Sequence, residues 1–234
     1  MSRYRDEYPA YISVAERKQM IQEKREELEE TMELNPITIS GRLISKTFWG
    51  KAWCKNIESY QDYENRLPRG RSYLKHGAVL ELKITKGHIF ALVLGSELYE
   101  VNIKIKPLEK EDWERIKKEC AGKIESLMDL IQGKLSDDVI EVLCDHETGL
   151  FPEPSEITLI CNCPDYSDLC KHLAATLYGV GARLDSDPTL FFLLRGVDQN
   201  ELFDANIDDV TQSDDDIEVD GDLEALFDID LDTL

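Results

Sequence analysis

The chain has 234 residues, enough for one domain of ordinary size with additional arms. Hydrophobic residues make up 42% of it, which excludes a wholly disordered chain. The formal charge is −21, and the 15 acids that follow Arg195, with no basic residue among them, carry most of that charge. Residues 41–108 instead hold twelve Lys and Arg against six Asp and Glu, so a basic stretch and an acidic tail share one chain.

Neither the apolar runs nor the cysteines indicate export or membrane insertion. The longest apolar runs, 89–94 and 190–194, are far shorter than the roughly 20 residues of a membrane-spanning helix. The first nine residues contain no apolar stretch that would form a secretory signal. We therefore expect a cytoplasmic protein whose six cysteines are reduced thiols or metal ligands.

The N-terminal third begins with a helix signal. Ser13 and Glu16 have the spacing of a capping box, and the composition up to about Leu34 favours a helix with a thin apolar stripe. We expect a solvated arm there, with a partner-docking helix as the alternative. Residues 37–48 predict two short strands, and residues 50–60 a short helix.

The middle of the chain is rich in strand signals. The proline and glycine in 63–73 predict a loop. Three runs of alternating apolar and polar residues, 79–84, 89–94 and 99–105, predict an antiparallel meander. Apolar residues at helical spacing then predict one or two amphipathic helices over 109–132.

Three of the six cysteines and one of the four histidines lie within twelve residues, in the pattern C-x-C-x6-C-x-H. Cys161 and Cys163 are at positions i and i+2 of a predicted strand, so their side chains point the same way. Cys170 and His172 lie near the first turn of the helix that follows. Three thiolates and an imidazole form a complete tetrahedral zinc set, which leaves no position for water and is typical of structural sites. Three buried thiols beside a surface histidine are the disfavoured alternative.

This pattern, with Cys163-Pro-Asp and Cys170-Lys-His-x-Ala-Ala-x-x-Tyr, resembles the SWIM zinc finger. Four further blocks make residues 8–205 similar to the bacterial and archaeal SWIM zinc finger proteins: 47–54, 65–73, 95–101 and 187–196. The resemblance implies a protein that works with DNA or with other proteins and has no established catalytic activity. It also implies a protein partner, since this subfamily is often associated with SNF2-type helicases.

A basic stretch with interleaved tyrosines is the best candidate for contact with nucleic acid. Guanidinium groups can bind phosphates, and tyrosine rings can stack on unpaired bases. The alternative is a loop whose arginines pair with Asp62 and Glu64. The candidate phosphate contacts are Arg66, Arg69, Arg71 and Lys75, with Lys171 as a further one.

Other reactive or aromatic residues are assigned to the core. Phe48, Trp49 and Trp53 are expected to be buried rather than to stack on bases. Three single cysteines, Cys54, Cys120 and Cys144, are expected to be buried thiols. Cys144 and His146 form a second C-x-H pair, but no second C-x-C matches it.

No phosphate-binding glycine loop or hydrolase motif occurs, so an enzyme is disfavoured and no small-molecule substrate is evident.

The acidic tail has its own pattern. Such charge runs are usually solvated and disordered. Between Leu223 and Asp232, however, acids alternate with Phe227, Ile229 and Leu231. This segment could therefore dock on a partner, or fold back on the basic stretch 41–108.

Together these observations predict an α+β protein: a small antiparallel sheet with helices, and a zinc-bound hairpin and helix. The favoured function is a non-enzymatic zinc protein that binds DNA, protein or both, and the alternative is a protein-interaction adaptor without nucleic-acid contact. The predicted segments are a helical arm (1–35), a β-rich domain (36–106), a helical connector (107–150), the zinc finger with following helices (151–205) and the acidic tail (206–234).

Overall fold

The computed structural model describes residues 13–60, 66–145, 147–165 and 167–202. These residues form helices and a sheet, which confirms the predicted α+β class. In chain order the elements are α1 (Val14–Glu29), α2 (Phe48–Glu58), α3 (Leu67–Lys75), β1 (Val79–Thr85), β2 (His88–Leu94), β3 (Leu98–Ile105), α4 (Lys110–Cys120), α5 (Leu127–Gln132), α6 (Asp137–Leu143), the 3-10 helix η2 (Pro154–Glu156), β4 (Ile157–Cys161), α7 (Lys171–Leu184) and α8 (Thr189–Arg195).

The sheet is a four-stranded antiparallel meander in the order β1-β2-β3-β4. The first three strands follow one another directly, as the alternating runs predict. The fourth strand comes after α4, α5 and α6, and it pairs with β3 so that Cys161 lies opposite Val101. The strand of the cysteine motif is therefore part of the main sheet rather than of a separate hairpin.

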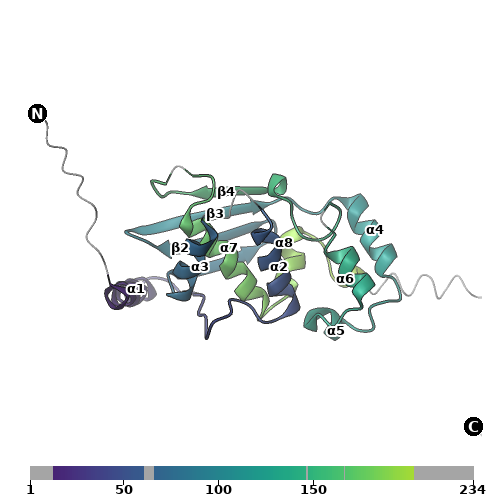
Figure 1. The fold of residues 1–234 in the computed structure, drawn as a ribbon, viewed down its shortest axis with the longest axis horizontal. Helices are drawn as coiled ribbons and strands as arrows, with labels where there is room; N and C mark the ends of the chain where they lie inside the picture. Colours follow the sequence, from purple (N-terminus) through teal and green to yellow (C-terminus); the bar gives the residue numbers. More distant parts are fainter. Residues whose placement is uncertain (1–12, 61–65, 146, 166, 203–234) are drawn as a thin grey trace, which may run out of the picture.

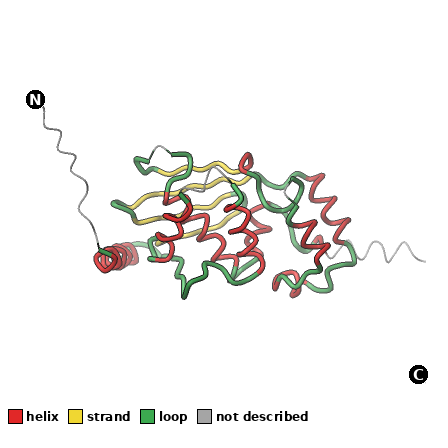
Figure 2. Tube along the Cα trace, in the orientation of Figure 1, coloured by secondary structure: helices red, strands yellow, loops and turns green. Residues whose placement is uncertain are grey.

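Helices cover one face of this sheet (Figures 1 and 2). Helix α7 lies centrally against the strands, with α3 and α2 packed beside it. Residues of β3 explain why one face is covered, because Tyr99, Val101 and Ile103 are buried while Glu100 and Lys104 are exposed. The cysteine motif therefore joins the central helix to a strand of the sheet.

Two local predictions are wrong. The stretch predicted as a loop contains helix α3, since Pro68 lies in the first turn, where proline is tolerated. The stretch 37–48 is not a pair of strands. Instead, its beginning runs beside β1, where the Ile37 amide donates to the Val79 carbonyl at 3.2 Å.

Glycines allow the helices to approach α7 closely. A Cβ atom on Gly70 would lie 2.4 Å from the Cβ of Ala174, and one on Gly50 would lie 2.3 Å from the carbonyl oxygen of Gly181. Such separations are far inside van der Waals contact, so any side chain at these positions would push α3 or α2 away from α7. Residues 68–71 are helical despite their proline and glycine because α3 packs closely against α7.

The core is rich in aromatic rings. Trp49 and Trp53 are fully buried, as predicted, and their indole N–H groups donate to the carbonyls of Leu130 and Leu177 at 2.8 Å. Phe48 is half-buried. Because α2 supplies both tryptophans, it joins the α5 region to the central helix α7.

Buried residues of the sheet, the connector and the zinc-motif segment belong to one hydrophobic cluster. Helix α1 contributes Ile21 to it, while most of that helix is exposed.

The predicted tail 206–234 lies outside the described residues. No helix within the described ranges is both long enough and apolar enough to cross a membrane.

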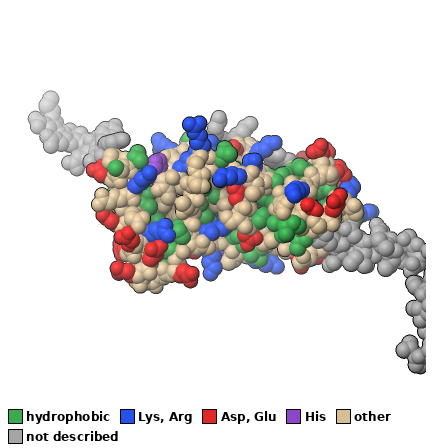
Figure 3. All heavy atoms as spheres, turned by 90° about the horizontal axis from the view of Figure 1, so that it is seen from below, with side chains coloured by type: hydrophobic (Ala, Val, Ile, Leu, Met, Phe, Trp, Pro, Cys, Tyr) green, Lys and Arg blue, Asp and Glu red, His purple; other side chains and the backbone are tan. Residues whose placement is uncertain are grey.

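Charge is unevenly distributed over the surface seen from below. Figure 3 shows Lys and Arg side chains over the central part of this face, with Asp and Glu mainly toward its two ends. One of these ends carries α1, which is rich in glutamate. The Lys and Arg side chains on this face therefore lie mainly over the elements at the centre of the molecule.

Candidate metal centre

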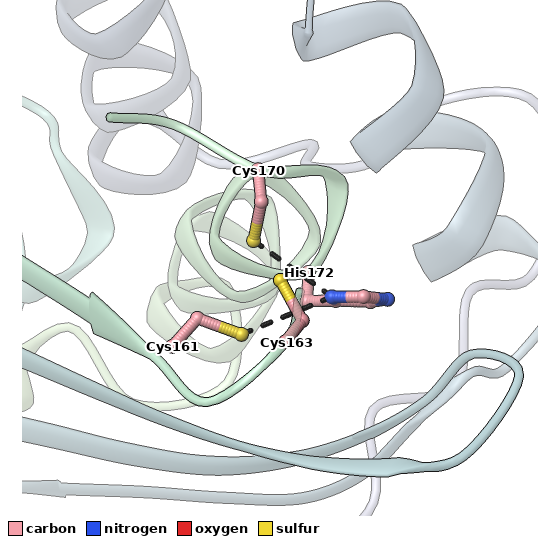
Figure 4. A group of neighbouring side chains, drawn as sticks. All are labelled: Cys161, Cys163, Cys170 and His172. Carbon is pink, nitrogen blue, oxygen red and sulfur yellow. Dashed lines mark hydrogen bonds between the residues drawn. The ribbon is translucent and has the colours of Figure 1, made fainter. Parts of the chain in front are cut away.

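The four predicted ligands come together at the end of β4 and the start of α7. Their ligand atoms all lie within 4.8 Å of one another, and Figure 4 shows three sulfur atoms and one ring nitrogen grouped together. Cys161 ends β4, while Cys170 is the N-cap of α7 and His172 lies in its first turn. The helix positions inferred from the spacing are those observed, but the predicted strand ends two residues early, so Cys163 lies just beyond β4 rather than in it.

The distances fit a tetrahedral zinc ion. Nδ1 of His172 lies 3.8 Å from Sγ of Cys161 and 3.7 Å from Sγ of Cys170. Zinc bound at about 2.3 Å to sulfur and about 2.0 Å to nitrogen would place these atoms roughly 3.6 Å apart. Three sulfurs and one nitrogen are also the donor set that zinc prefers, so the residues present fit this metal.

The position of Cys170 favours its thiolate form. A hydrogen bond from the Cys161 thiol, together with contacts from His172 and the Leu173 amide, lowers the pKa of Cys170 to about 4. The Leu173 amide lies 3.4 Å from Sγ, as expected for a side chain that caps a helix N-terminus. The Cys161 thiol donates in this pair, and its pKa is raised. A preformed thiolate suits binding of a cation.

Packing holds the imidazole of His172 in one orientation. The ring of Tyr99 stacks on it at 4.4 Å, and the ring of Tyr73 meets its edge at 5.6 Å. Its Nε2 atom is buried and has no hydrogen-bond partner among the described residues. A Cβ atom on Gly95 would lie 2.6 Å from this nitrogen. The absence of a side chain at Gly95 therefore lets the β2–β3 turn lie directly against the ring, on its Nε2 side.

These packing residues are part of the site that the cysteine spacing alone could not reveal. Gly95, Tyr99 and Tyr73 fall in blocks that carry the SWIM resemblance, but their role becomes clear when the sheet places them beside His172. Asp165, in the loop between Cys163 and Cys170, pairs with Arg66, whose Nη1 lies 3.2 Å from Oδ2, and accepts a hydrogen bond from Ser167.

The structure divides the predicted phosphate contacts into two groups. Arg66 pairs with Asp165 beside the cysteine cluster, and the Nζ of Lys171 lies 5.6 Å above the ring of Tyr73. Arg71 and Lys75 lie instead along a cavity that also contacts α2. Arg69 is exposed between the two groups. The proposed pairing with Asp62 and Glu64 falls on residues that are not described.

The other cysteines have no part in the metal cluster. Burial raises the pKa of Cys54 and of Cys120 to about 11. Cys144 was expected to be buried but is exposed, because it ends α6 beside a groove between α2 and α6. Its proposed companion His146 lies outside the described residues.

No protein-family model matches the chain, and no solved structure matches it. The chain is 34% identical over 162 residues to the uncharacterized protein Rv2102 of Mycobacterium tuberculosis (strain ATCC 25618 / H37Rv). The alignment covers 68% of this chain and 58% of the relative, so the chain spans less than two thirds of that protein's length. The membership in the SWIM family stays a prediction, while the cluster of three cysteines and a histidine is present at metal-binding distances.

Proposed function

We propose that this chain is a zinc-stabilised, non-catalytic module that binds nucleic acid as part of a larger machine. The observation that carries the proposal is the closed cluster formed by Cys161, Cys163, Cys170 and His172. Four protein ligands complete a tetrahedral shell, so no coordination position is left for substrate or water. This supports a structural role for the metal.

The location of the cluster supports the same role. Cys170 and His172 are 1% and 2% exposed, and they begin the helix that lies against the sheet and packs with α2 and α3. Zinc would therefore tie β4 to the central helix of the fold. Apparent binding energies of about 10 kcal/mol or more in small zinc modules are large beside the stability of a domain.

Nucleic-acid contact is supported by basic residues of α3 and α7. Arg69 is exposed and forms no ion pair with any described residue, and Lys171 is half-buried in the first turn of α7 with its Nζ over the ring of Tyr73. The resemblance to SWIM proteins favours DNA as the ligand and an SNF2-type helicase as the partner. Both are parts of this proposal.

The metal is tested on the purified chain by native mass spectrometry. We expect one zinc ion per chain, and Cys163→Ser should lose it and lower the melting temperature. Cys144→Ser is the matched control, because Cys144 is a cysteine outside the cluster. A chain that binds no zinc, or a Cys163→Ser variant that keeps full zinc affinity, would contradict the metal assignment.

Nucleic-acid binding is tested by measuring the affinity for single- and double-stranded DNA at several salt concentrations. Phosphate contacts predict that the logarithm of the association constant falls linearly with the logarithm of the salt concentration. Arg69→Glu should weaken binding, and Lys118→Glu on α4 should not. If the wild-type chain shows no DNA affinity at low salt, the nucleic-acid part of the proposal fails.

A groove along β4 favours a second candidate function, an adaptor that binds protein. This groove of about 540 Å³ is lined by Ile157–Cys161 and by residues of the cysteine loop, and β4 is the last strand of the sheet. An extended peptide could add to such an edge. Cross-linking at Ile160, which is 47% exposed, would capture a partner protein if this candidate is correct.

A further inference from the structure

A second charged site lies away from the zinc cluster, between α2, α3 and the loop that precedes α2. It is a cavity of about 230 Å³ with Tyr178 of α7 among its lining residues. Its charged side chains come from all three of these segments: Arg42 from the loop, Lys51, Lys55 and Glu58 from α2, and Arg71 and Lys75 from α3. Five cations thus surround a small space with one carboxylate.

That carboxylate is already engaged. Glu58 forms an ion pair with Arg71 and accepts a hydrogen bond of 2.7 Å from the hydroxyl of Tyr178. The remaining four cations form no ion pair with any residue in the described part of the chain. Among the described residues, the cavity therefore has an excess of positive charge that no further ion pair neutralises.

The cations are arranged as two facing pairs. Lys51 and Lys55 are four residues apart on α2, and Arg71 and Lys75 are four residues apart on α3. Like charges at this spacing destabilise a helix. An anion between the two helices would offset both repulsions at once.

Arg71 is held in place for such a ligand. Its Nη2 lies 3.0 Å from the hydroxyl of Tyr178, and its guanidinium lies 5.1 Å from the centre of the same ring. Tyr178 is 1% exposed, so this anchor is rigid. A guanidinium fixed in this way can bind oxygen atoms with little loss of side-chain entropy.

We propose that this cavity binds a phosphate group. Phosphate presents several charged oxygens in a compact shape, which suits cations that approach from three segments. The phosphate could belong to a nucleic-acid strand, in which case the inference rests on the proposed function, or to a free diphosphate. The strand is favoured because an adjoining groove of about 430 Å³ shares Lys51 and Lys55, so a chain held by one phosphate in the cavity could continue into that groove.

The test uses the full-length, zinc-loaded chain and two probes, a single-stranded oligonucleotide and inorganic pyrophosphate, with binding measured by calorimetry. Lys55→Glu combined with Lys75→Glu should weaken binding at least tenfold, because both exposed lysines face the cavity. Lys118→Glu on the exposed face of α4 is the matched control and should bind like the wild type. Unchanged thermal unfolding and zinc content would show that the variants are folded.

The outcomes separate this site from the proposed function. Weakened binding of either probe in the cavity variant alone supports a phosphate site. If the oligonucleotide binds equally well to the cavity variant and pyrophosphate does not bind, the cavity proposal is overturned while nucleic-acid binding stands. If pyrophosphate alone binds, and the cavity variant loses it, the phosphate site stands and nucleic-acid binding fails. Binding of neither probe overturns both.

Discussion

At the scale of single residues, the position of one metal ligand depends on residues that are not ligands themselves. His172 supplies a ligand atom, but Tyr99, Tyr73 and the backbone of Gly95 determine where its ring lies. Residues that orient a ligand commonly affect metal affinity tenfold to about a hundredfold. Here the orientation comes from packing, because Nε2 of the ring finds no hydrogen-bond partner in the described part of the chain.

Gly95→Ala should therefore weaken zinc binding although no ligand is changed. The added Cβ would lie 2.6 Å from Nε2 of His172 and 2.8 Å from the ring of Tyr99, so the imidazole must leave the position in which its Nδ1 faces the sulfurs at 3.7 to 3.8 Å. We expect the zinc dissociation constant to rise roughly tenfold or more. Competition with a chelating indicator at neutral pH measures this constant.

Glu97→Ala is the control for this prediction, since Glu97 lies in the same turn and is exposed. It should leave the zinc affinity unchanged. An unchanged affinity in Gly95→Ala would show that the ring position is set by the cysteines rather than by the turn.

At the scale of secondary structure, the sequence predicted the elements whose signals are local. The alternating residues in 99–105 reflect a single strand with one buried face. The spacing of the metal ligands reflects the end of one strand and the start of the next helix. Both signals involve only residues close together in the sequence. The sequence did not predict α3, because its proline and glycine suggest a loop when tertiary contacts are unknown. Gly70 is in fact the point where α3 meets Ala174 of α7.

The place of β4 in the sheet was equally hidden from the sequence. More than fifty residues separate it from its partner β3, and no local pattern encodes so distant a pairing. Likewise, the alternation of Ile37 and Ile39 suggested a strand. The extended segment there lies beside β1 without joining the sheet.

Gly70→Ala should destabilise the protein, against the usual preference of helices for alanine. The propensity gain is up to about 1 kcal/mol. The added methyl would lie 2.4 Å from the Cβ and 2.7 Å from the backbone of Ala174, and such overpacking costs about 1 to 3 kcal/mol. We expect a net loss in the free energy of unfolding, measured by urea denaturation with saturating zinc.

Arg69→Ala is the control for this helix, because Arg69 is the exposed neighbour of Gly70. Its free energy of unfolding should stay within about 0.5 kcal/mol of the wild type. A Gly70→Ala variant more stable than the wild type would mean that α3 and α7 can separate without cost.

At the scale of the whole molecule, the net charge of −21 misdescribes the surface that could meet a phosphate. The cavity between α2 and α3 is lined by five cations, and Lys and Arg also occupy the centre of the face in Figure 3. The residues after Asn206 hold twelve acids and no base. A polyanionic segment of the same chain is present at high effective concentration, so it would compete with any phosphate ligand.

Removing the residues after Asn206 should therefore raise the affinity for single-stranded DNA several-fold, most clearly at low salt, where charge interactions are least screened. The measurement is the dissociation constant of the full-length and shortened chains at two salt concentrations. A full-length control in which the twelve acids become Asn or Gln separates charge from length, and it should match the shortened chain. If the shortened chain binds DNA no more tightly than the full-length chain at low salt, the tail does not compete for the basic surface.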